Sequence, residues 1–136
     1  MIILDSWALL AWLQDERPAA DEVDELLANV DRAPVAMSRI NAGEIYYVIA
    51  KSRSISRAEE FRRVQERMPI TLASVTDDQV WRAARLKAIY PLSYADGFAA
   101  ALALHRDATL VTGDREFEPL VDGEGLKIQW LTRDAR

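Results

Sequence analysis

The chain has 136 residues, of which 50% are hydrophobic and 29% are charged, and its formal net charge is −5. This balance is typical of one folded domain with a single core, here expected over residues 1–136, and it argues against an intrinsically disordered chain. The chain has no cysteine, no apolar run long enough to cross a bilayer and no secretion signal, so we expect a cytoplasmic protein without disulfides or thiolate chemistry.

Short apolar runs alternate with longer segments of helical periodicity along the whole chain. The runs predict strands at Ile2–Leu4, Val35–Met37, Ile70–Ala73, Thr109–Thr112 and Lys127–Leu131. The longer segments predict helices at Ser6–Gln14, Ala19–Val30, Ile40–Lys51, Arg57–Arg67, Asp77–Ile89 and Ala95–His105. The spacings of Ser56 to Glu59 and of Thr76 to Gln79 are those of capping boxes. Such alternation predicts an α/β fold with a mainly parallel sheet covered on both faces, and its chemistry is expected at the carboxyl ends of the strands.

Asp5 stands between the first predicted strand and the apolar segment Trp7–Leu13. Aspartate is a favoured N-cap, so its carboxylate could simply accept backbone N–H bonds from the following helix. Ser6 could provide that cap instead. The position at the end of a strand equally suits a functional carboxylate, and the residue alone does not decide between the two roles.

Glu44 interrupts an apolar stripe in the helix predicted at Ile40–Lys51, where its neighbours at helical spacing are Ile40 and Val48. A lone carboxylate among apolar side chains is costly unless it is paired, protonated or bound to a metal. A buried salt bridge with an arginine is therefore the structural alternative to a functional role.

Asp96 and Asp114 also follow loops or strands, and each has a structural alternative. Ser93 and Asp96 have capping-box spacing, and the small residues after Asp96 favour a close approach of this helix to the sheet. Asp114 follows a predicted strand through Gly113 and could cap the short segment Arg115–Leu120.

Taken together, the four carboxylates would project toward one edge of a parallel sheet. Carboxylates that converge repel one another and raise one another's pKa values, and a hard divalent cation relieves that repulsion. With no cysteine and a single histidine, the acidic set favours Mg²⁺ or Mn²⁺ over zinc.

Four segments of the chain resemble, in order, the acidic motifs of PIN domains, and most closely those of VapC toxins: LDSWALLAWL, NAGEIYYVIA, SYADGFAAALAL and LVTGDREF. The resemblance implies a three-layer α/β/α sandwich around a parallel sheet of about five strands. It also implies an endoribonuclease that depends on Mg²⁺ or Mn²⁺. Asp5, Glu44, Asp96 and Asp114 match the family's catalytic and metal-binding quartet. Thr112 and Glu116 match supporting positions, and Trp7 departs from the small or polar residue common there.

The resemblance further implies an RNA substrate, a homodimer and a cognate antitoxin whose tail occupies a groove. Our hypothesis is that a basic side chain of this tail enters the acidic cluster and inhibits by competing with the metal. Because the net charge is acidic, RNA binding would need local basic residues, for which the candidates are Arg39, Arg115, Lys51 and Arg53. The apolar segment Trp7–Leu13 and the pair Tyr46–Tyr47 favour contact with another chain.

Three alternatives to a ribonuclease fit the sequence less well. A PIN-like module that binds RNA or protein without cleavage would gain nothing from four repelling carboxylates. A haloacid-dehalogenase-like phosphatase requires a second aspartate at position 7, where this chain has Trp7. A dinucleotide-binding domain requires a glycine-rich turn after the first strand, and the sequence has none there.

Overall fold

Five parallel strands form one sheet in the order β3-β2-β1-β4-β5 in a computed structural model that describes residues 1–133. The central strand pairs Ile3 with Ala36 on one side and Leu4 with Val111 on the other. The carboxyl ends of β1 and β4 are therefore neighbours, and the predicted parallel sheet is confirmed. The strands are β1 (Ile2–Leu4), β2 (Val35–Ser38), β3 (Thr71–Ala73), β4 (Thr109–Thr112) and β5 (Lys127–Trp130).

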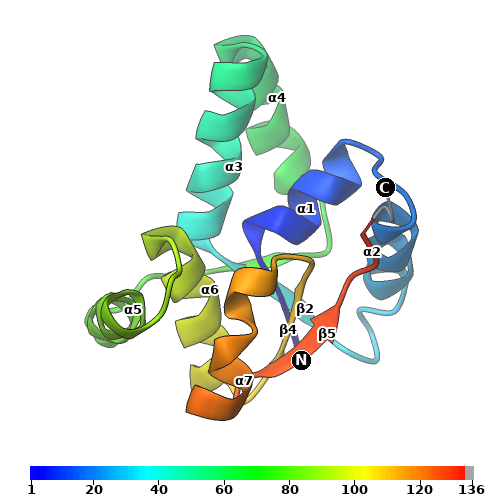
Figure 1. Ribbon diagram of the computed structural model, residues 1–136. Helices are drawn as coiled ribbons and strands as arrows, with labels where there is room; N and C mark the ends of the chain where they lie inside the picture. Colours follow the sequence, from blue (N-terminus) through cyan, green and yellow to red (C-terminus); the bar gives the residue numbers. More distant parts are fainter. Residues whose placement is uncertain (134–136) are drawn as a thin grey trace.

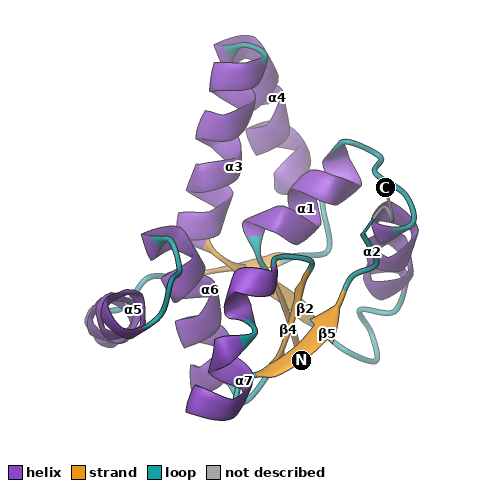
Figure 2. Cartoon of the chain, in the orientation of Figure 1, coloured by secondary structure: helices purple, strands orange, loops and turns teal. Residues whose placement is uncertain are grey.

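Helices cover both faces of the sheet and complete the expected three-layer sandwich (Figure 1 and Figure 2). Alternate side chains of β1 explain the two cores: Ile3 packs toward α5, α6 and α7, whereas Ile2 and Leu4 pack toward α1 to α4. Helices α3 and α4 form a hairpin that extends away from the sheet (Figure 1). The helices are α1 (Ser6–Leu13), α2 (Ala19–Ala28), α3 (Arg39–Ser52), α4 (Ile55–Gln65), α5 (Asp77–Ile89), α6 (Tyr94–His105) and α7 (Pro119–Glu124), with a 3₁₀ turn η1 (Arg115–Phe117).

Capping side chains set where several helices begin. Thr76 Oγ1 accepts a hydrogen bond from Gln79 N at 3.2 Å, as the spacing predicts. The predicted start at Ser56 is wrong, because Ser54 Oγ accepts from Arg57 N at 3.1 Å and α4 begins two residues earlier than expected. The segment after Asp114 also extends further than expected. It forms η1 and then α7, which ends at Gly125 in the left-handed conformation (φ 74°).

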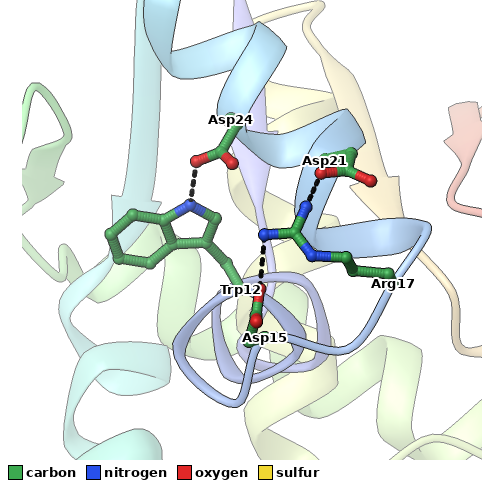
Figure 3. Close-up of polar contacts among 5 residues, drawn as sticks. All are labelled: Trp12, Asp15, Arg17, Asp21 and Asp24. Carbon is green, nitrogen blue, oxygen red and sulfur yellow. Dashed lines mark hydrogen bonds and ion pairs between the residues drawn. The ribbon is translucent and has the colours of Figure 1, made fainter.

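Helix α1 is apolar on nearly every side, as its sequence predicts, and a polar network holds its end against α2 (Figure 3). The Trp12 indole N–H donates to Asp24 Oδ1 at 2.5 Å. The Arg17 guanidinium pairs with Asp15 at 2.7 Å and with Asp21. No helix within residues 1–133 is both long enough and apolar enough to span a membrane.

Candidate metal centre

Asp5 lies directly after β1 and is completely buried. Its Oδ1 accepts a hydrogen bond from Ala8 N at 2.9 Å, so the capping role open in the sequence belongs to Asp5 rather than Ser6. Its Oδ2 accepts from Thr112 Oγ1 at 2.5 Å, which joins the ends of β1 and β4. Asp5 therefore caps α1 and still lies at the carboxyl edge, where chemistry was expected.

The end of β4 brings Asp114 to the same edge. Thr112 Oγ1 accepts from Asp114 N at 3.0 Å, and Asp114 Oδ1 accepts from Glu116 N at 3.0 Å. Through the second of these bonds Asp114 caps the 3₁₀ turn η1, which is one of the two roles that the sequence left open for this residue. Asp114 is half-buried and Glu116 is exposed. Thr112 thus touches Asp5 through its hydroxyl hydrogen and the Asp114 amide through its oxygen.

Trp7 lies against the turn that positions Asp114. A Cβ added to Gly113 would stand 2.3 Å from the Trp7 ring, so only glycine fits beneath this indole. Sequence reasoning left Trp7 without a role. The structure assigns it to covering the β4–η1 turn.

Asp96 enters from the first turn of α6, where Ser93 Oγ accepts from Asp96 N at 3.1 Å. The first turn of α6 packs closely against α5, since a Cβ on Gly97 would stand 2.9 Å from the Ala83 carbonyl oxygen. Asp96 is consequently buried, with 9% of its surface exposed.

Glu44 reaches the site from α3 and is half-buried. Its Oε1 accepts a hydrogen bond from Ser6 Oγ. The ion pairs within residues 1–133 do not include Glu44, so the salt bridge considered from sequence is replaced by this serine contact. Ser6 and Asn41, which contacts it, were not among the predicted site residues. The position of Asn41 one helical turn before Glu44 is the signal that could have identified it.

Three carboxylates come close enough to share one ion. Oxygen atoms of Asp96, Asp114 and Glu116 all lie within 4.8 Å of one another. Glu116, which the sequence ranks only as supporting, belongs to this group. Asp5 and Glu44 lie beside this group: the charges of Asp96 and Asp114 raise the pKa of Asp5, and the charge of Glu44 raises the pKa of Asp96.

Burial and mutual repulsion hold protons at this edge. Burial raises the pKa of Asp5 to about 8, and the charges of Asp96 and Asp114 add to the rise, against the hydrogen bonds from Thr112 and Ala8. Burial raises the pKa of Asp96 to about 6, with further contributions from the charges of Asp114 and Glu44. A bound divalent cation would offset the repulsion between these carboxylates, which contributes to the raised pKa values of Asp5 and Asp96. The ligand atoms offered are all carboxylate oxygens, which fits Mg²⁺ or Mn²⁺.

The basic residues expected to bind RNA differ in how close they lie to the acidic group. Arg115 lies between Asp114 and Glu116 in the chain, and its guanidinium stacks 4.3 Å above the Trp130 ring. Arg39 begins α3 and lines a cavity with Tyr46 and Arg62. Lys51 and Arg53 lie at the far end of α3, the end that extends away from the sheet (Figure 1).

Comparison with solved structures finds the same fold in several toxin–antitoxin proteins. VapBC2 of Rickettsia felis, solved with promoter DNA, aligns with a TM-score of 0.73 and 16% identity over 97% of this chain and 100% of that chain. VapC20 of Mycobacterium tuberculosis, described as a sarcin–ricin loop cleaving toxin, aligns with a TM-score of 0.71 and 16% identity over 88% and 94%. VapBC-1 of nontypeable Haemophilus influenzae aligns with a TM-score of 0.65 and 23% identity over 96% and 98%.

At these identities the structural likeness shows the fold, and the sequence evidence comes from a family model. No curated protein matches the chain. The model of the PIN domain matches residues 2–121. Since this match covers most of the sequence and all of the acidic residues described above, the chain belongs to the PIN domain family.

Proposed function

We propose that this protein is an endoribonuclease that depends on Mg²⁺ or Mn²⁺ and acts as the toxin of a type II toxin–antitoxin pair. The observation that carries the proposal is the group of three carboxylates, Asp96, Asp114 and Glu116, beside buried Asp5 at the carboxyl edge of the sheet. A site of this kind lowers stability without a cation, because its carboxylates repel one another and two of them, Asp5 and Asp96, are buried.

Within this proposal Asp5, Glu44, Asp96 and Asp114 are the catalytic and metal-binding residues, with Glu116 and Thr112 in support. When bound, the cation supplies Lewis-acid chemistry that neutralises phosphate charge and acidifies water. Asp96, Asp114 and Glu116 offer the oxygen ligands nearest to one another. Thr112 holds Asp5 and the Asp114 backbone in fixed relation.

RNA would approach across the exposed side of this edge. The Arg115 guanidinium, held on Trp130, supplies a positive charge next to the acidic group and is the basic residue best placed for a phosphate. Arg39, Lys51 and Arg53 remain candidates for contacts farther along the RNA. The solved neighbours support this substrate class, since one of them is described as cleaving the sarcin–ricin loop.

The partner proposed is an antitoxin, together with a second copy of the chain. A groove of about 520 Å³ runs between α1 and the α3–α4 hairpin, with Leu10, Ile49 and Phe61 among its lining residues. It suits the apolar face of an antitoxin segment. Several neighbours were solved as toxin–antitoxin complexes. For the homodimer, exposed apolar side chains such as Tyr47 and Trp81 offer surface that a second copy could cover.

The test incubates purified, antitoxin-free protein with total cellular RNA in Mn²⁺ or in EDTA. We expect discrete fragments in Mn²⁺ alone, absent with Asp5→Asn and Asp96→Asn and retained with Asp31→Asn, an exposed aspartate outside the site. Cleavage that persists in both site variants would overturn the residue assignment. Mn²⁺ binding without cleavage of any RNA would favour the module that binds without cutting.

A further inference from the structure

A buried polar network connects the three chain segments that carry Asp5, Glu44 and Asp96. Asn41 is fully buried, and its Nδ2 donates to Ser6 Oγ at 3.2 Å and to the Ala95 carbonyl oxygen at 3.1 Å. Ser6 follows Asp5 in the chain, and Ala95 precedes Asp96. One amide group therefore joins α1, α3 and the first turn of α6.

The direction of each hydrogen bond in this network is determined by chemistry. The Ala95 oxygen can only accept, so the Asn41 amide must turn its NH₂ group toward it. Ser6 has one hydroxyl hydrogen to donate. Its Oγ atom lies much closer to Glu44 Oε1 than to the backbone carbonyl oxygen of Asn41, which is 3.3 Å away. Ser6 thus accepts from Asn41 and donates to Glu44, forming a directed chain from amide to hydroxyl to carboxylate.

This arrangement leaves the Asn41 Oδ1 atom buried without a hydrogen-bond partner among residues 1–133. Reversing the amide would not satisfy Oδ1. It would turn Oδ1 toward the Ala95 carbonyl oxygen, and two acceptors would then face each other. A buried acceptor without a partner lowers stability relative to an apolar side chain of the same shape. The network thus joins three helix starts through the Asn41 NH₂ group alone.

We propose that Asn41 and Ser6 are positioning residues that hold Asp5, Glu44 and Asp96 in the spacing that cation binding requires. Neither residue needs to touch the cation or the substrate for this role. Asn41 sets the distance between α3 and α6, and Ser6 sets the orientation of the Glu44 carboxylate. The inference rests on the proposed metal-dependent function and names the residues that support its ligands.

Four variants test the proposal. Asn41→Leu keeps the approximate size and removes both donated bonds, Ser6→Ala removes the hydroxyl, and Ser6→Thr restores it. Thr76→Ala is the matched control, because the hydrogen bond that it removes caps α5 through Gln79 N and involves none of the site carboxylates. Each protein is measured for Mn²⁺ affinity by calorimetry, for thermal stability, and for kcat and KM on RNA.

We expect Asn41→Leu and Ser6→Ala to weaken Mn²⁺ binding about tenfold, the usual effect of losing a hydrogen-bond partner of a metal ligand. Ser6→Thr should restore binding to within about threefold, and kcat should fall more than KM rises. Thr76→Ala should lower thermal stability and leave Mn²⁺ affinity unchanged. If Asn41→Leu does not fold, Ser6→Ala and Ser6→Thr carry the test.

Unchanged Mn²⁺ affinity in Asn41→Leu and Ser6→Ala would overturn the positioning role, and so would an equal loss in Thr76→Ala. If the unmodified protein binds no Mn²⁺, the proposed function fails instead. Crystal structures of the unmodified protein and of Ser6→Ala then decide the positioning role. It is supported if the Glu44 carboxylate moves and overturned if Glu44 and Asp96 stay in place.

Discussion

Two groups of carboxylates lie near opposite ends of α1 and differ in what neutralises them. At the corner between α1 and α2, Asp15 and Asp21 pair with Arg17, and Asp24 accepts from Trp12 (Figure 3). At the carboxyl edge of the sheet, the acidic residues contact hydroxyls and amides, and no ion pair within residues 1–133 includes them. The first group is exposed and has an arginine among its partners, whereas the second is partly buried and has no basic partner within residues 1–133.

Under the proposed function, this difference separates structural from functional use of the same side chain. An exposed aspartate with a nearby arginine contributes little to stability and needs no other partner. A buried aspartate beside other carboxylates lowers the stability of the fold unless a cation or a basic side chain neutralises the negative charge. The contrast can be tested by substitutions in each group, and the predictions below run from the largest expected effect to the smallest.

The largest effect is expected from Asp96→Asn compared with Asp21→Asn. Asp96→Asn removes a proposed ligand and the charge that the cation would balance, so RNA cleavage should fall on the order of 100-fold or more. Asp21→Asn changes the paired group and should leave cleavage within about twofold of the unmodified protein. Equal losses in single-turnover cleavage assays would remove the distinction between the two groups.

The second effect is on the stability of the metal-free protein as a function of pH. In the unfolded chain Asp5 and Asp96 release their protons near the ordinary pKa of 3.8. In the folded protein the pKa of Asp5 is raised to about 8 and that of Asp96 to about 6, so both keep their protons to higher pH. The folded state binds more protons between these limits, so its free energy of unfolding should fall as pH rises from about 4 to about 8. Below pH 4 both states are protonated, and the decrease should be absent.

Denaturant unfolding in EDTA at pH 5 and pH 8 checks this decrease. Asp5→Asn should reduce it and raise stability at pH 8, while Mn²⁺ should stabilise the unmodified protein more at pH 8 than at pH 5, because Asp5 and Asp96 hold fewer protons at pH 8. Asp21→Asn should leave the decrease unchanged. Stability that rises between pH 5 and pH 8 by the same amount in the unmodified protein and in Asp5→Asn would contradict the prediction.

The sequence predicted the fold well because the fold depends on pattern. Short apolar runs alternating with amphipathic segments specify the sheet, and strand ends specify where Asp5 and Asp114 must lie. Contacts between side chains distant in the chain were not predictable in this way. The bond from Ser6 to Glu44 joins residues 38 positions apart, and Thr112 reaches Asp5 across 107 positions. Periodicity also gave no sign that Trp7 would cover Gly113.

A third and smaller effect follows from the contact of Trp7 with Gly113, on the sheet side of the comparison. Gly113→Ala would place a methyl group 2.3 Å from the indole, so we expect a loss of about 1–3 kcal/mol in the free energy of unfolding. The displaced turn carries Asp114, and Mn²⁺ affinity should fall with it. In the Trp7→Ala background the same substitution should cost much less, which a double-mutant cycle measures. Equal costs in both backgrounds would show that the indole does not constrain this turn.

The smallest effect is expected from Arg17→Ala at the α1–α2 corner. The Arg17 side chain is 53% exposed, so its pairs with Asp15 and Asp21 should contribute at most about 1 kcal/mol to the free energy of unfolding, decreasing in high salt. Mn²⁺ affinity should not change, because the acidic residues at the sheet edge do not depend on this arginine for neutralisation. A clear change in Mn²⁺ affinity on Arg17→Ala would mean that the two groups form one electrostatic unit. The separation between paired and cation-dependent carboxylates would then be wrong, even if every substitution at the sheet edge behaved as expected.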